Sequence, residues 1–491
     1  MIKDKMKSWK EVINEARQGR QVQSDSRRVC PGDIFVAMPG TRVHGNSFIP
    51  EALDRGAAFV VAREPAVQER VIHHDDPALA LGELARAHFG TDRLSMKVVG
   101  VTGTNGKTTT SYILEHIFTS IGYKTGVLGT VNYRWPGTVL KAGTTTPDCL
   151  DLHRMLARMQ AHGVEVVCLE ASSHALDQKR LAGIDIHVAV FTGLSRDHLD
   201  YHNDIEDYFQ AKKKLFWPSN PQNFLGSVIN MDDPHGRDLA GEAPRVMGYG
   251  LQKNFSTELQ GHLVQSTASG LVMECSHQGR SWTISCSLPG IHNAQNLLAA
   301  QGAGICLGLE PQHFDCLKDL GPIPGRLEKV PAPEGINIYV DYAHTPDALE
   351  NVCLALKELS FSRLAVLFGC GGDRDRGKRP EMARAVAAHA DAVFLTSDNP
   401  RFEDPGSIIK DILPGLAGHP CVEVEPDRRQ AIQKAVSLLA PGEALLVAGK
   451  GHEDYQEIRG VRHDFSDTGE IQRAVSKLHC KVTGPCHTEV R

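Results

Sequence analysis

Residues 97–121 read KVVGVTGTNGKTTTSYILEHIFTSI and decide the fold of the chain. The apolar run 97–101 has the length and composition of a buried strand, and 108–121 has helical periodicity. A glycine-rich turn joins the two. A buried strand that runs through such a turn into a helix is typical of nucleotide-binding α/β domains. We therefore expect a parallel sheet covered by helices around this segment.

The glycine turn also has the side chains of a phosphate-binding loop. Its backbone N–H groups, with a helix N-terminus behind them, can wrap a phosphate. Lys107 would place a positive charge on the β- and γ-phosphates, and Thr108 would offer a hydroxyl to Mg²⁺. Val101 stands where the strict GxxxxGK[ST] pattern has its first glycine, so the stretch fits the shorter GxxGKT. The alternative is a plain glycine turn with an exposed lysine, but strand, loop and helix in this order favour a nucleoside-triphosphate site.

The alternation of buried strand and helix continues on the C-terminal side. Apolar runs of strand length occupy 164–169, 187–191 and 227–229, and 150–162 has helical spacing. Between residues 262 and 288 the pattern changes to polar–apolar alternation with glycines at turn spacing. This change predicts antiparallel hairpins inserted late in the same domain.

Two breaks divide the chain. A polar stretch at 90–93 follows a helical segment at 77–89, and GPIPG at 321–325 precedes a second series of apolar strand-length runs. Those runs lie at 336–340, 364–368, 392–395 and 444–447. We predict an α/β protein of three domains: a small α/β N-terminal domain (1–92), a central P-loop domain with a parallel sheet, helices on both faces and a small antiparallel insertion (93–322), and a C-terminal Rossmann-like domain (323–491).

Composition excludes several classes of protein. The 491 residues suggest about three domains, and 53 basic against 59 acidic residues give a net charge of −6. A mild acidic excess argues against a nucleic-acid partner, and no apolar run suits a membrane helix or signal peptide. The twelve cysteines lack CxxC or zinc-type spacing, which is typical of reduced thiols. We expect a cytoplasmic monomer with small-molecule substrates and no membrane insertion.

Acidic and imidazole side chains follow two of the expected strands. Glu170 comes directly after the run 164–169, and SRDHLDYH at 195–202, which contains His198, follows the next strand. Ligands of open α/β sheets gather at the carboxyl ends of the strands, and carboxylates there are well placed to hold Mg²⁺. Each segment alone could be a helix cap or a surface histidine. Both at consecutive strand ends favour a metal-assisted phosphate site.

A series of motifs in fixed order gives the chain a family resemblance. The motifs are DSRRVCPGD (25–33), GTNGKT (103–108), EASSH (170–174), DHLD (197–200), PGR (324–326), DYAHTPD (341–347), GCGGDRD (369–375), DNPR (398–401) and GKGHE (449–453). Together they resemble the Mur ligases, the ATP-dependent amide-forming ligases of peptidoglycan precursor synthesis. The resemblance spans nearly the whole chain.

The resemblance implies a reaction and its cofactors. DNPR resembles the signature of the diaminopimelate-adding branch, which implies addition of meso-2,6-diaminopimelate to UDP-N-acetylmuramoyl-L-alanyl-D-glutamate, with ATP as co-substrate, Mg²⁺ as cofactor and an acyl phosphate intermediate. Arg401 or Arg374 can grip the second carboxylate of diaminopimelate bidentately, whereas lysine has no carboxylate there. The alternatives are a lysine-adding enzyme of the family, a folylpolyglutamate-synthetase-like ligase, and, from another class, a P-loop protein that uses nucleotide as a switch.

The resemblance also assigns residues to each substrate. ATP contacts are implied for Gly103, Thr104, Asn105, Gly106, Lys107, Thr108, Thr109, Asn293, Asn296, Arg326, Asp341 and His344. Contacts to the uridine-nucleotide substrate are implied for Ser26, Arg27, His44, Thr144, Thr145, Thr146, Ser172, Gln178 and Arg180. Contacts to diaminopimelate are implied for Arg374, Asp398, Asn399, Pro400, Arg401, Gly449 and Glu453, where Glu453 would pair with an ammonium group.

The catalytic positions that the resemblance implies are Lys107, Glu170, His198 and Lys212, and the Mg²⁺ ligands are Thr108, Glu170, His198 and Lys212. Lys212 matches the lysine that the family carboxylates with CO₂, a change that turns a cation into an anion able to bind Mg²⁺. Without the resemblance, the triple lysine at 212–214 is more typical of a solvated basic face. Two positions depart from the family pattern: Thr144 replaces an asparagine and can make only one of an amide's hydrogen bonds, and Gly193 removes an amide near the metal.

Overall fold

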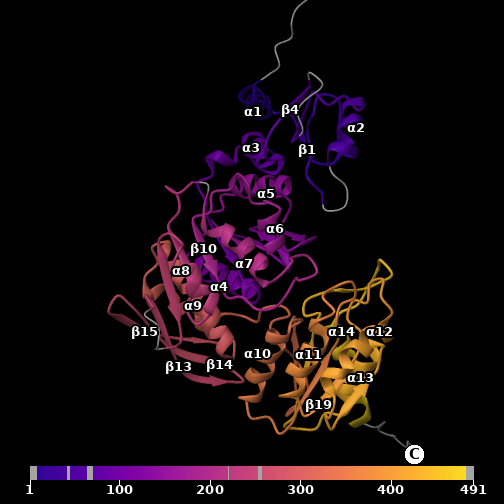
Figure 1. Ribbon diagram of the computed structural model, residues 1–491. Helices are drawn as coiled ribbons and strands as arrows, with labels where there is room; N and C mark the ends of the chain where they lie inside the picture. The colour runs from indigo at the N-terminus through magenta and orange to yellow at the C-terminus, as the bar shows by residue number, and fades with distance from the viewer. Residues whose placement is uncertain (1–7, 41–44, 64–69, 219, 253–256, 483–491) are drawn as a thin grey trace, which may run out of the picture.

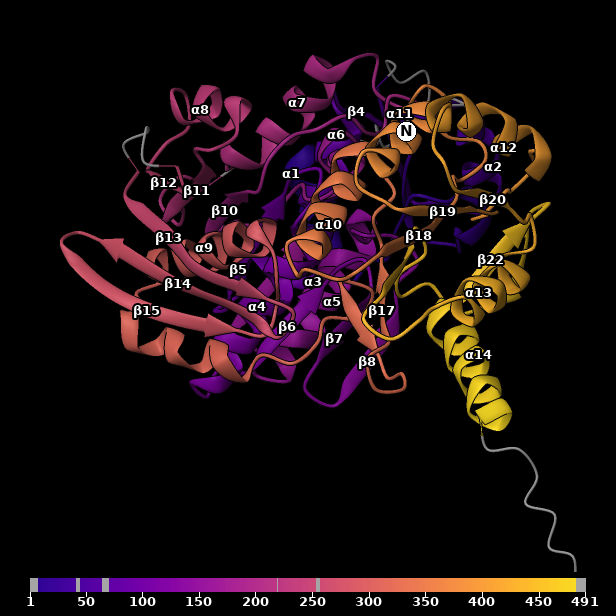
Figure 2. The same cartoon turned by 90° about the horizontal axis from the view of Figure 1, so that it is seen from below.

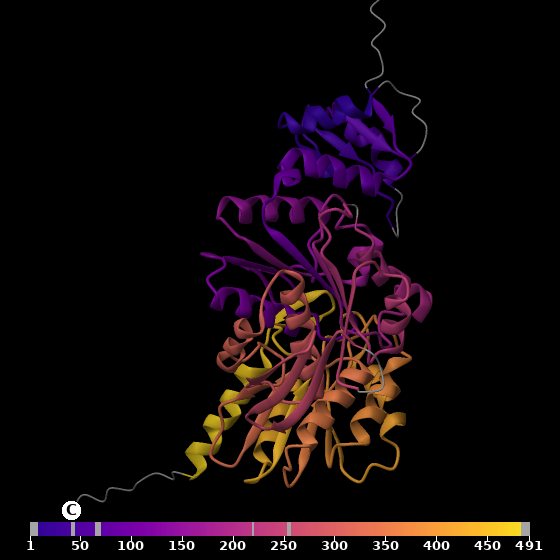
Figure 3. The ribbon, with the colours of Figure 1, turned by 90° about the vertical axis from the view of Figure 1, so that its left-hand side faces the viewer.

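The computed structural model describes residues 8–40, 45–63, 70–218, 220–252 and 257–482. Three sheets follow one another along the chain and form three α/β domains (Figure 1). In Figure 3 the N-terminal domain lies at one end of the molecule, the C-terminal domain at the other, and the central domain between them. The three-domain α/β architecture predicted from the sequence is confirmed. None of the described helices is long and apolar enough to cross a membrane.

The N-terminal domain is a four-stranded parallel sheet in the order β1-β2-β3-β4. Its strands are β1 (Val22–Gln23), β2 (Ile34–Val36), β3 (Phe59–Ala62) and β4 (Val71–His73). Its helices are α1 (Trp9–Arg17), α2 (Ile49–Asp54) and α3 (Pro77–Phe89). The carboxylate of Asp76 caps α3 by accepting hydrogen bonds from two backbone N–H groups of its first turn. The bounds of α3 are those predicted from the sequence.

The central sheet has eleven strands in the order β15-β14-β13-β12-β11-β10-β5-β9-β6-β7-β8. The six in its middle are parallel: β12 (Val246–Gly250), β11 (Gly226–Asn230), β10 (Val188–Phe191), β5 (Lys97–Thr102), β9 (Val166–Glu170) and β6 (Thr125–Leu128). Alternate residues of β5 pack into two different cores. Burial on both faces explains why these strands read as continuous apolar runs.

Helices cover both faces of this parallel sheet. One core contains side chains of α4 (Lys107–Ser120) and α9 (Ile291–Cys306), and the other those of α5 (Cys149–Ala161) and α7 (Ile205–Lys213). Two shorter helices, α6 (Ser173–Asp177) and α8 (Pro234–Ala240), follow β9 and β11. The expected runs at 97–101, 164–169, 187–191 and 227–229 correspond to β5, β9, β10 and β11, so the P-loop lies in the middle of the sheet.

Antiparallel hairpins extend the central sheet at both edges, and at one edge the first hairpin strand still pairs in parallel with β12. The hairpins predicted at 262–288 are β13 (Leu259–Thr267), β14 (Gly270–His277) and β15 (Arg280–Cys286), and this prediction is confirmed. A second hairpin, β7 (Asn132–Trp135) and β8 (Thr138–Lys141), extends the opposite edge and was not predicted. Each of its strands has only four residues, too few for a clear alternating pattern.

The C-terminal sheet has the order β16-β17-β21-β18-β19-β20. Its strands are β16 (Glu328–Val330), β17 (Asn337–Asp341), β21 (Ala444–Ala448), β18 (Leu364–Phe368), β19 (Ala392–Leu395) and β20 (Val422–Val424), and all pairs are parallel except β16 with β17. The helices are α10 (Pro346–Lys357), α11 (Lys378–Ala387), α12 (Pro405–Ile412), α13 (Arg428–Ser437) and α14 (Asp467–Val482). A hairpin of β22 (Tyr455–Ile458) and β23 (Val461–Asp464) stands outside this sheet (Figure 2).

Candidate active site

The phosphate-binding loop follows β5 at its carboxyl end and leads into α4. Residues 104–109 line a cavity of about 460 Å³ between the central and C-terminal domains. Gly106 has a φ of +85°, and a Cβ at this position would lie 2.4 Å from Oδ1 of Asn296. Only glycine fits there, because a side chain would be strained and would collide with α9. The glycine thus lets the loop approach α9 closely at the edge of the cavity.

Two lysine side chains converge behind this loop. Nζ of Lys107 donates to the backbone oxygens of Gly103 at 2.8 Å and Thr104 at 2.9 Å, and Nζ of Lys212 donates to the same Gly103 oxygen at 2.8 Å. Lys212 is 1% exposed, and its Nζ lies 4.3 Å from the centre of the Tyr208 ring. Burial lowers the pKa of both amines, and Lys107 lowers that of Lys212 further. The triple lysine is therefore no solvated basic face at Lys212.

The carboxylate of Glu170, at the end of β9, is surrounded by hydroxyl groups. Its Oε2 accepts hydrogen bonds from Thr108 at 3.0 Å and Thr130 at 2.7 Å, and its Oε1 lies 3.4 Å from Ser111 Oγ. The Thr108 hydroxyl also accepts a hydrogen bond from Arg326 of the C-terminal domain at 3.0 Å. These are hard oxygen donors of the kind that Mg²⁺ prefers.

The donor set beside the loop fits a magnesium ion that keeps several other ligands. In the described part of the chain, no group of three or more His, Cys, Asp or Glu side chains is arranged to hold a metal. The protein ligands would instead be few, with Thr108 and Glu170 at their centre. Mg²⁺ commonly binds through one or two protein oxygens and takes its remaining ligands from water and phosphate.

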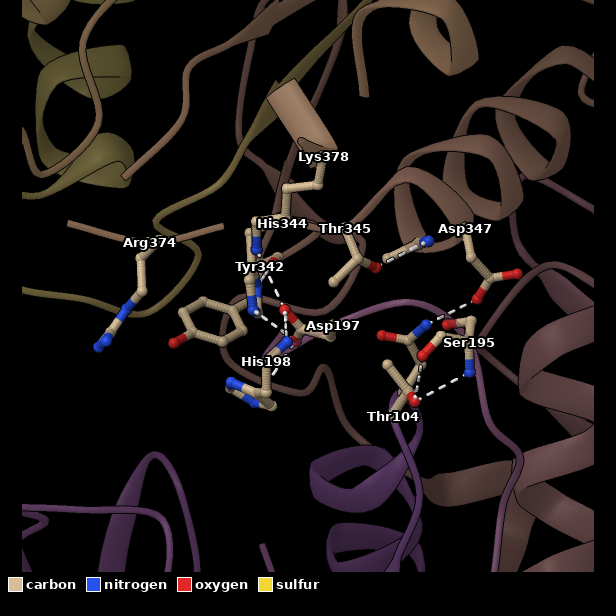
Figure 4. A network of polar contacts seen from close by, with 12 residues as sticks. Thr104, Ser195, Asp197, His198, Tyr342, His344, Thr345, Asp347, Arg374 and Lys378 are labelled. Carbon is tan, nitrogen blue, oxygen red and sulfur yellow. Dashed lines mark hydrogen bonds and ion pairs between the residues drawn. The ribbon is translucent and has the colours of Figure 1, made fainter. Parts of the chain in front are cut away.

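Asp197 lies where the central and C-terminal domains meet (Figure 4). Its Oδ1 accepts a hydrogen bond from Lys378 Nζ at 3.1 Å, and its Oδ2 lies 3.4 Å from His198 Nε2 and 3.8 Å from His344 Nε2. Burial acts to raise the pKa of Asp197, but His198, Lys378 and His344 hold that pKa well below its usual range. Burial lowers the pKa of His198 to about 3, so its ring is neutral at pH 7 and able to bind a metal.

Further ion pairs join the two domains beside Asp197. Arg196 of the central domain contacts Glu381 at 2.7 Å, and Arg374 of the C-terminal domain contacts Asp200 at 3.3 Å. In Figure 4 the Arg374 side chain extends away from the Asp197 cluster. The sequence analysis identified neither Lys378 nor these pairings, because the partners lie more than 170 residues apart in the chain.

The residues assigned to ATP gather at the first cavity. Besides the loop, its lining contains Asn293, Asn296, Arg326, Asp341 and His344. The lining also contains residues that the sequence analysis did not assign: Thr130, Asn230, Asp232, Asp233, Tyr342, Asp347, Ala348 and Asn351. Asn230 could have been found, because it ends a predicted strand just as Glu170 does.

A second cavity, of about 660 Å³, lies between the N-terminal and central domains. Ser24 and Arg63 of the N-terminal domain line it, as do Gln178, Arg180 and Tyr201 of the central domain. Its lining therefore contains two of the residues assigned to the uridine-nucleotide substrate. A guanidinium in the wall of a cavity this size suits a phosphorylated ligand.

Other residues assigned to the nucleotide substrate lie away from this cavity. The Ser26 hydroxyl is buried and donates to Glu51 at 2.7 Å, and Arg27 is exposed and paired with Asp25 at 2.8 Å. His44 lies outside the described residues. The structure thus places Ser24, two residues before Ser26, in the cavity wall instead.

The segment between the two cavities is built around α6. Ser172 caps this helix and lines the first cavity with Thr145, while Gln178, which follows the helix, lines the second. The Thr146 hydroxyl donates to the backbone oxygen of Glu170 at 2.7 Å, and the hydroxyl of Thr144 donates to the backbone oxygen of Thr146 at 2.7 Å. The Thr144 hydroxyl therefore forms a hydrogen bond within its own loop.

The second departure from the family pattern, Gly193, also has a structural consequence. Gly193 lines the first cavity, and a Cβ there would lie 3.0 Å from Oδ2 of Asp233. Asp233 accepts a hydrogen bond from the backbone N–H of Leu194 at 2.8 Å. The carboxylate of Asp233 thus borders the space that a larger residue at position 193 would enter.

The residues assigned to diaminopimelate form a separate cluster in the C-terminal domain. Arg401 donates to the backbone oxygen of Gly372 at 2.6 Å and pairs through its backbone with β22. Asp398, Asn399 and Pro400 follow β19, while Gly449 and Glu453 follow β21. A Cβ at Gly449 would lie 2.8 Å from Oδ2 of Asp398, so glycine there makes room for the carboxylate. The cluster combines an arginine with two carboxylates.

A buried cation already sits beside Glu453. Nζ of Lys450 donates to Glu453 Oε2 at 2.9 Å and to Asn399 Oδ1 at 3.1 Å, and Asn399 donates to the same Glu453 oxygen at 2.8 Å. The sequence analysis quoted Lys450 as part of a motif and gave it no role. A lysine next to a predicted buried strand and two acidic residues was the available signal.

Comparisons with known proteins agree over most of the chain. Residues 20–89 match the family described as "Mur ligase family, catalytic domain", residues 101–304 "Mur ligase middle domain", and residues 325–451 "Mur ligase, glutamate ligase domain". The chain is 48% identical over 456 residues to the UDP-N-acetylmuramoyl-L-alanyl-D-glutamate--2,6-diaminopimelate ligase of Lawsonia intracellularis, covering 91% of this chain and 94% of that one. It is 42% identical to the protein of that name from Thermosynechococcus vestitus, covering 93% of each. A solved structure of a ligase of that name is 35% identical, with a TM-score of 0.68, and covers 94% of this chain and 95% of the other.

Proposed function

The chain belongs to the Mur ligase family, and we propose that it joins meso-2,6-diaminopimelate to UDP-N-acetylmuramoyl-L-alanyl-D-glutamate while converting ATP to ADP and phosphate. The observation that carries this proposal is the cluster in the C-terminal domain, where Arg401 and Asp398 belong to one loop after β19 and Asn399 of that loop binds Glu453. Such a pair of opposite charges suits the carboxylate and ammonium at the far end of diaminopimelate. A lysine substrate would leave the arginine without a carboxylate.

We propose one substrate for each domain. The uridine nucleotide is assigned to the second cavity, between domain 1–92 and domain 93–322, and ATP to the first cavity, on the P-loop. Diaminopimelate is assigned to domain 323–491, with the residues that the resemblance implies. The reacting carboxylate would then arrive along α6, past Ser172, at the wall of the ATP cavity. That the protein is a cytoplasmic monomer stays a prediction.

The first step is attack of the D-glutamate carboxylate oxygen on the γ-phosphorus of ATP, with ADP leaving. The ammonium of Lys107 and the N-terminus of α4 neutralise the charge that develops on the transferred phosphoryl group. Mg²⁺ held by Thr108 and Glu170, with His198 and a modified Lys212 as further candidate ligands, would supply additional charge neutralisation when bound. Arg326 reaches the same place from the C-terminal domain through Thr108.

In the second step the amine of diaminopimelate attacks the acyl phosphate through a tetrahedral intermediate, and phosphate leaves. An acyl phosphate is readily hydrolysed, so water must be kept out until the amine arrives. The contacts of Lys378 with Asp197 and of Arg196 with Glu381 hold the C-terminal domain against the cavity. We assign to these contacts the exclusion of water.

We further propose that Lys212 is carboxylated by CO₂. Its amine is buried beside Lys107, which would repel an ammonium but would stabilise a carbamate anion. The test is ¹³C NMR of the protein in ¹³C-bicarbonate, compared with Lys212→Met. A carbamate signal in the wild type that is absent in the variant is expected, and identical spectra would contradict the assignment. Lys213→Met is the matched control, because Lys213 pairs with Glu242 near the surface.

The function is tested by measuring ATP consumption with purified protein, the uridine-nucleotide dipeptide and one amino acid at a time. Turnover with meso-diaminopimelate, and far less with lysine, is expected. Equal or faster turnover with lysine would assign the chain to the lysine-adding enzymes. Thermal stabilisation by a folate, with none by the uridine nucleotide, would favour a folylpolyglutamate-synthetase-like ligase. Binding of ATP with no turnover in any combination would favour a nucleotide switch.

A further inference from the structure

Lys450 is the most deeply buried charged group in the amino-acid cluster. Its side chain is fully inaccessible to solvent, whereas the side chains of Asp398 and Glu453 are 8% and 15% exposed. Lys450 is thus more deeply buried than either carboxylate, and Glu453 is the most exposed of the three side chains.

The hydrogen bonds of Glu453 are concentrated on one oxygen. Oε2 accepts from Lys450 Nζ at 2.9 Å and from Asn399 Nδ2 at 2.8 Å. No hydrogen-bond partner of Oε1 is found among the described residues. Asn399 is itself fixed, because its Oδ1 accepts from Lys450 at 3.1 Å and from the backbone N–H of Glu457 at 2.9 Å. The carboxylate is thus held by one oxygen and has the other available.

The surroundings of Glu453 disfavour its charge unless a cation is present. The Asp398 carboxylate lies 3.9 Å from Nζ of Lys450, the same amine that binds Glu453. Burial raises the pKa of Glu453, and Asp398 raises it further, while Lys450 acts to lower it. Arg428 is also close, but its guanidinium is bound to Asp467 by two hydrogen bonds of 2.7 Å. Lys450 is therefore the cation that directly contacts Glu453.

We propose that Lys450 is a positioning residue for the incoming amino acid: it keeps Glu453 ionised and fixed through Oε2, so that Oε1 is presented to the ammonium group of the substrate. The inference rests on the function proposed above and adds a residue to its specificity. Loss of the Lys450 charge leaves the carboxylate of Glu453 partly buried beside Asp398 with no cation in contact, which disfavours the ionised form of Glu453. A protonated Glu453 binds an ammonium poorly.

Several other titratable or charged groups surround Glu453, and among them the neighbouring His452 has its pKa lowered to about 4, mainly by burial and to a smaller degree by Arg326 and Lys450. The others come from every element packed against Glu453: Asp398 and Arg401 after β19, Arg428 of α13, Arg326 and Tyr342 near β17, and Tyr455 of β22. The Lys450 side chain also lies 5.3 Å from the centre of the Tyr455 ring. Because burial is the main cause of the low pKa of His452, the pH dependence that appears on substitution is expected to come from Glu453.

The test compares wild-type protein with Lys450→Met in steady-state assays at pH 7 and pH 9. The KM for diaminopimelate is expected to rise roughly tenfold or more at pH 7, and the defect should shrink at pH 9, because a higher pH favours the ionised form of Glu453. The KM values for ATP and the uridine nucleotide should stay near those of the wild type. Lys434→Met is the matched control, because Lys434 pairs with Glu423 on the surface of the same domain.

A double-variant cycle separates charge from structure. Glu453→Gln should raise the KM for diaminopimelate in the wild type and add little in the Lys450→Met background at pH 7, because loss of Lys450 already disfavours the charge of Glu453. Lys450→Gln keeps the hydrogen bonding without the charge, and replaces Lys450→Met if that variant does not fold. Additive effects, an equal rise of all three KM values, or a defect independent of pH would overturn the inference. A wild type without amino-acid turnover would overturn the proposed function and this inference together.

Discussion

Arg428 offers the sharpest test of how the amino-acid cluster is held together. It stands at the start of α13, fully buried, and its guanidinium binds both oxygens of the equally buried Asp467 at 2.7 Å. The same guanidinium donates to the backbone oxygen of Ala448 at 2.9 Å and lies 3.4 Å from that of Ser397. Those two residues directly precede Gly449 and Asp398. One side chain therefore joins the two segments that form the cluster.

Replacing Arg428 with methionine leaves the carboxylate of Asp467 buried without its cation. Removing one partner of a fully buried ion pair costs about 3–5 kcal/mol, and two hydrogen bonds to backbone oxygens are lost as well. Opening of the C-terminal domain should therefore become roughly 150- to 5,000-fold more frequent. The expected functional result is a higher KM for diaminopimelate and a smaller change in the KM for ATP.

The assay must report on the C-terminal domain alone. The four tryptophans lie at positions 9, 135, 217 and 282, so their fluorescence reports on the other two domains. Hydrogen exchange measured by mass spectrometry on peptides that cover β18 and β21 reports on the C-terminal domain. Faster exchange of these peptides, with unchanged exchange of β5 and β9, is the expected result.

Arg429→Met is the matched control, because the Arg429 side chain is half-exposed and its partner Glu470 also binds Arg473 at 2.6 Å. Glu470 is buried but keeps Arg473 as its partner in the variant, so the loss should be only about 1 kcal/mol. Comparable exchange in the Arg428 and Arg429 variants would refute the reasoning. Arg428→Met combined with Asp467→Leu should recover part of the loss, since no buried charge then remains.

Three more outcomes are expected. Arg401→Ala should lower kcat/KM for diaminopimelate roughly 10- to 100-fold with an unchanged KM for ATP, and an unaltered KM for diaminopimelate would contradict its role. Thr130→Val removes the 2.7 Å hydrogen bond to Glu170 and should slow turnover about tenfold, as measured by ADP release. Burial lowers the pKa of His153 from 6.5 to about 4. Between pH 6.5 and pH 4 the unfolded chain therefore binds a proton at His153 that the folded chain does not bind. The stability present above pH 6.5 is thus lost as the pH falls towards 4. The contribution is about 3 kcal/mol, and His153→Gln should flatten the fall in melting temperature.

Local patterns made much of the central domain predictable. A strand, a glycine turn and a helix lie next to one another in the sequence at 97–121, and the buried parallel strands read as continuous apolar runs. The β7–β8 hairpin was missed because each of its strands has only four residues, too few for a clear alternating pattern. The antiparallel strands β13, β14 and β15 have seven to nine residues each, and their alternation was long enough to be recognised.

Contacts between domains could not be predicted in the same way. Lys378 and Asp197 are 181 residues apart, and each is flanked by other charged residues that could have been its partner instead. Only the packing of α11 against the loop after β10 selects this pair. Lys450 was missed for a related reason, because a lysine in a motif has the same letters whether it is buried or solvated.

The helix α6 fixes a length. It has five residues, with a cap at Ser172 in the wall of one cavity and Gln178 in the wall of the other, and a helix of that size spans roughly 7–8 Å. Because a helix is rigid along its axis, α6 sets the distance between the wall of the first cavity at Ser172 and the wall of the second at Gln178. On the proposed assignment of the substrates, a nucleotide whose peptide is one residue shorter or longer is expected to bind at the second cavity without bringing its carboxylate to the phosphate in the first.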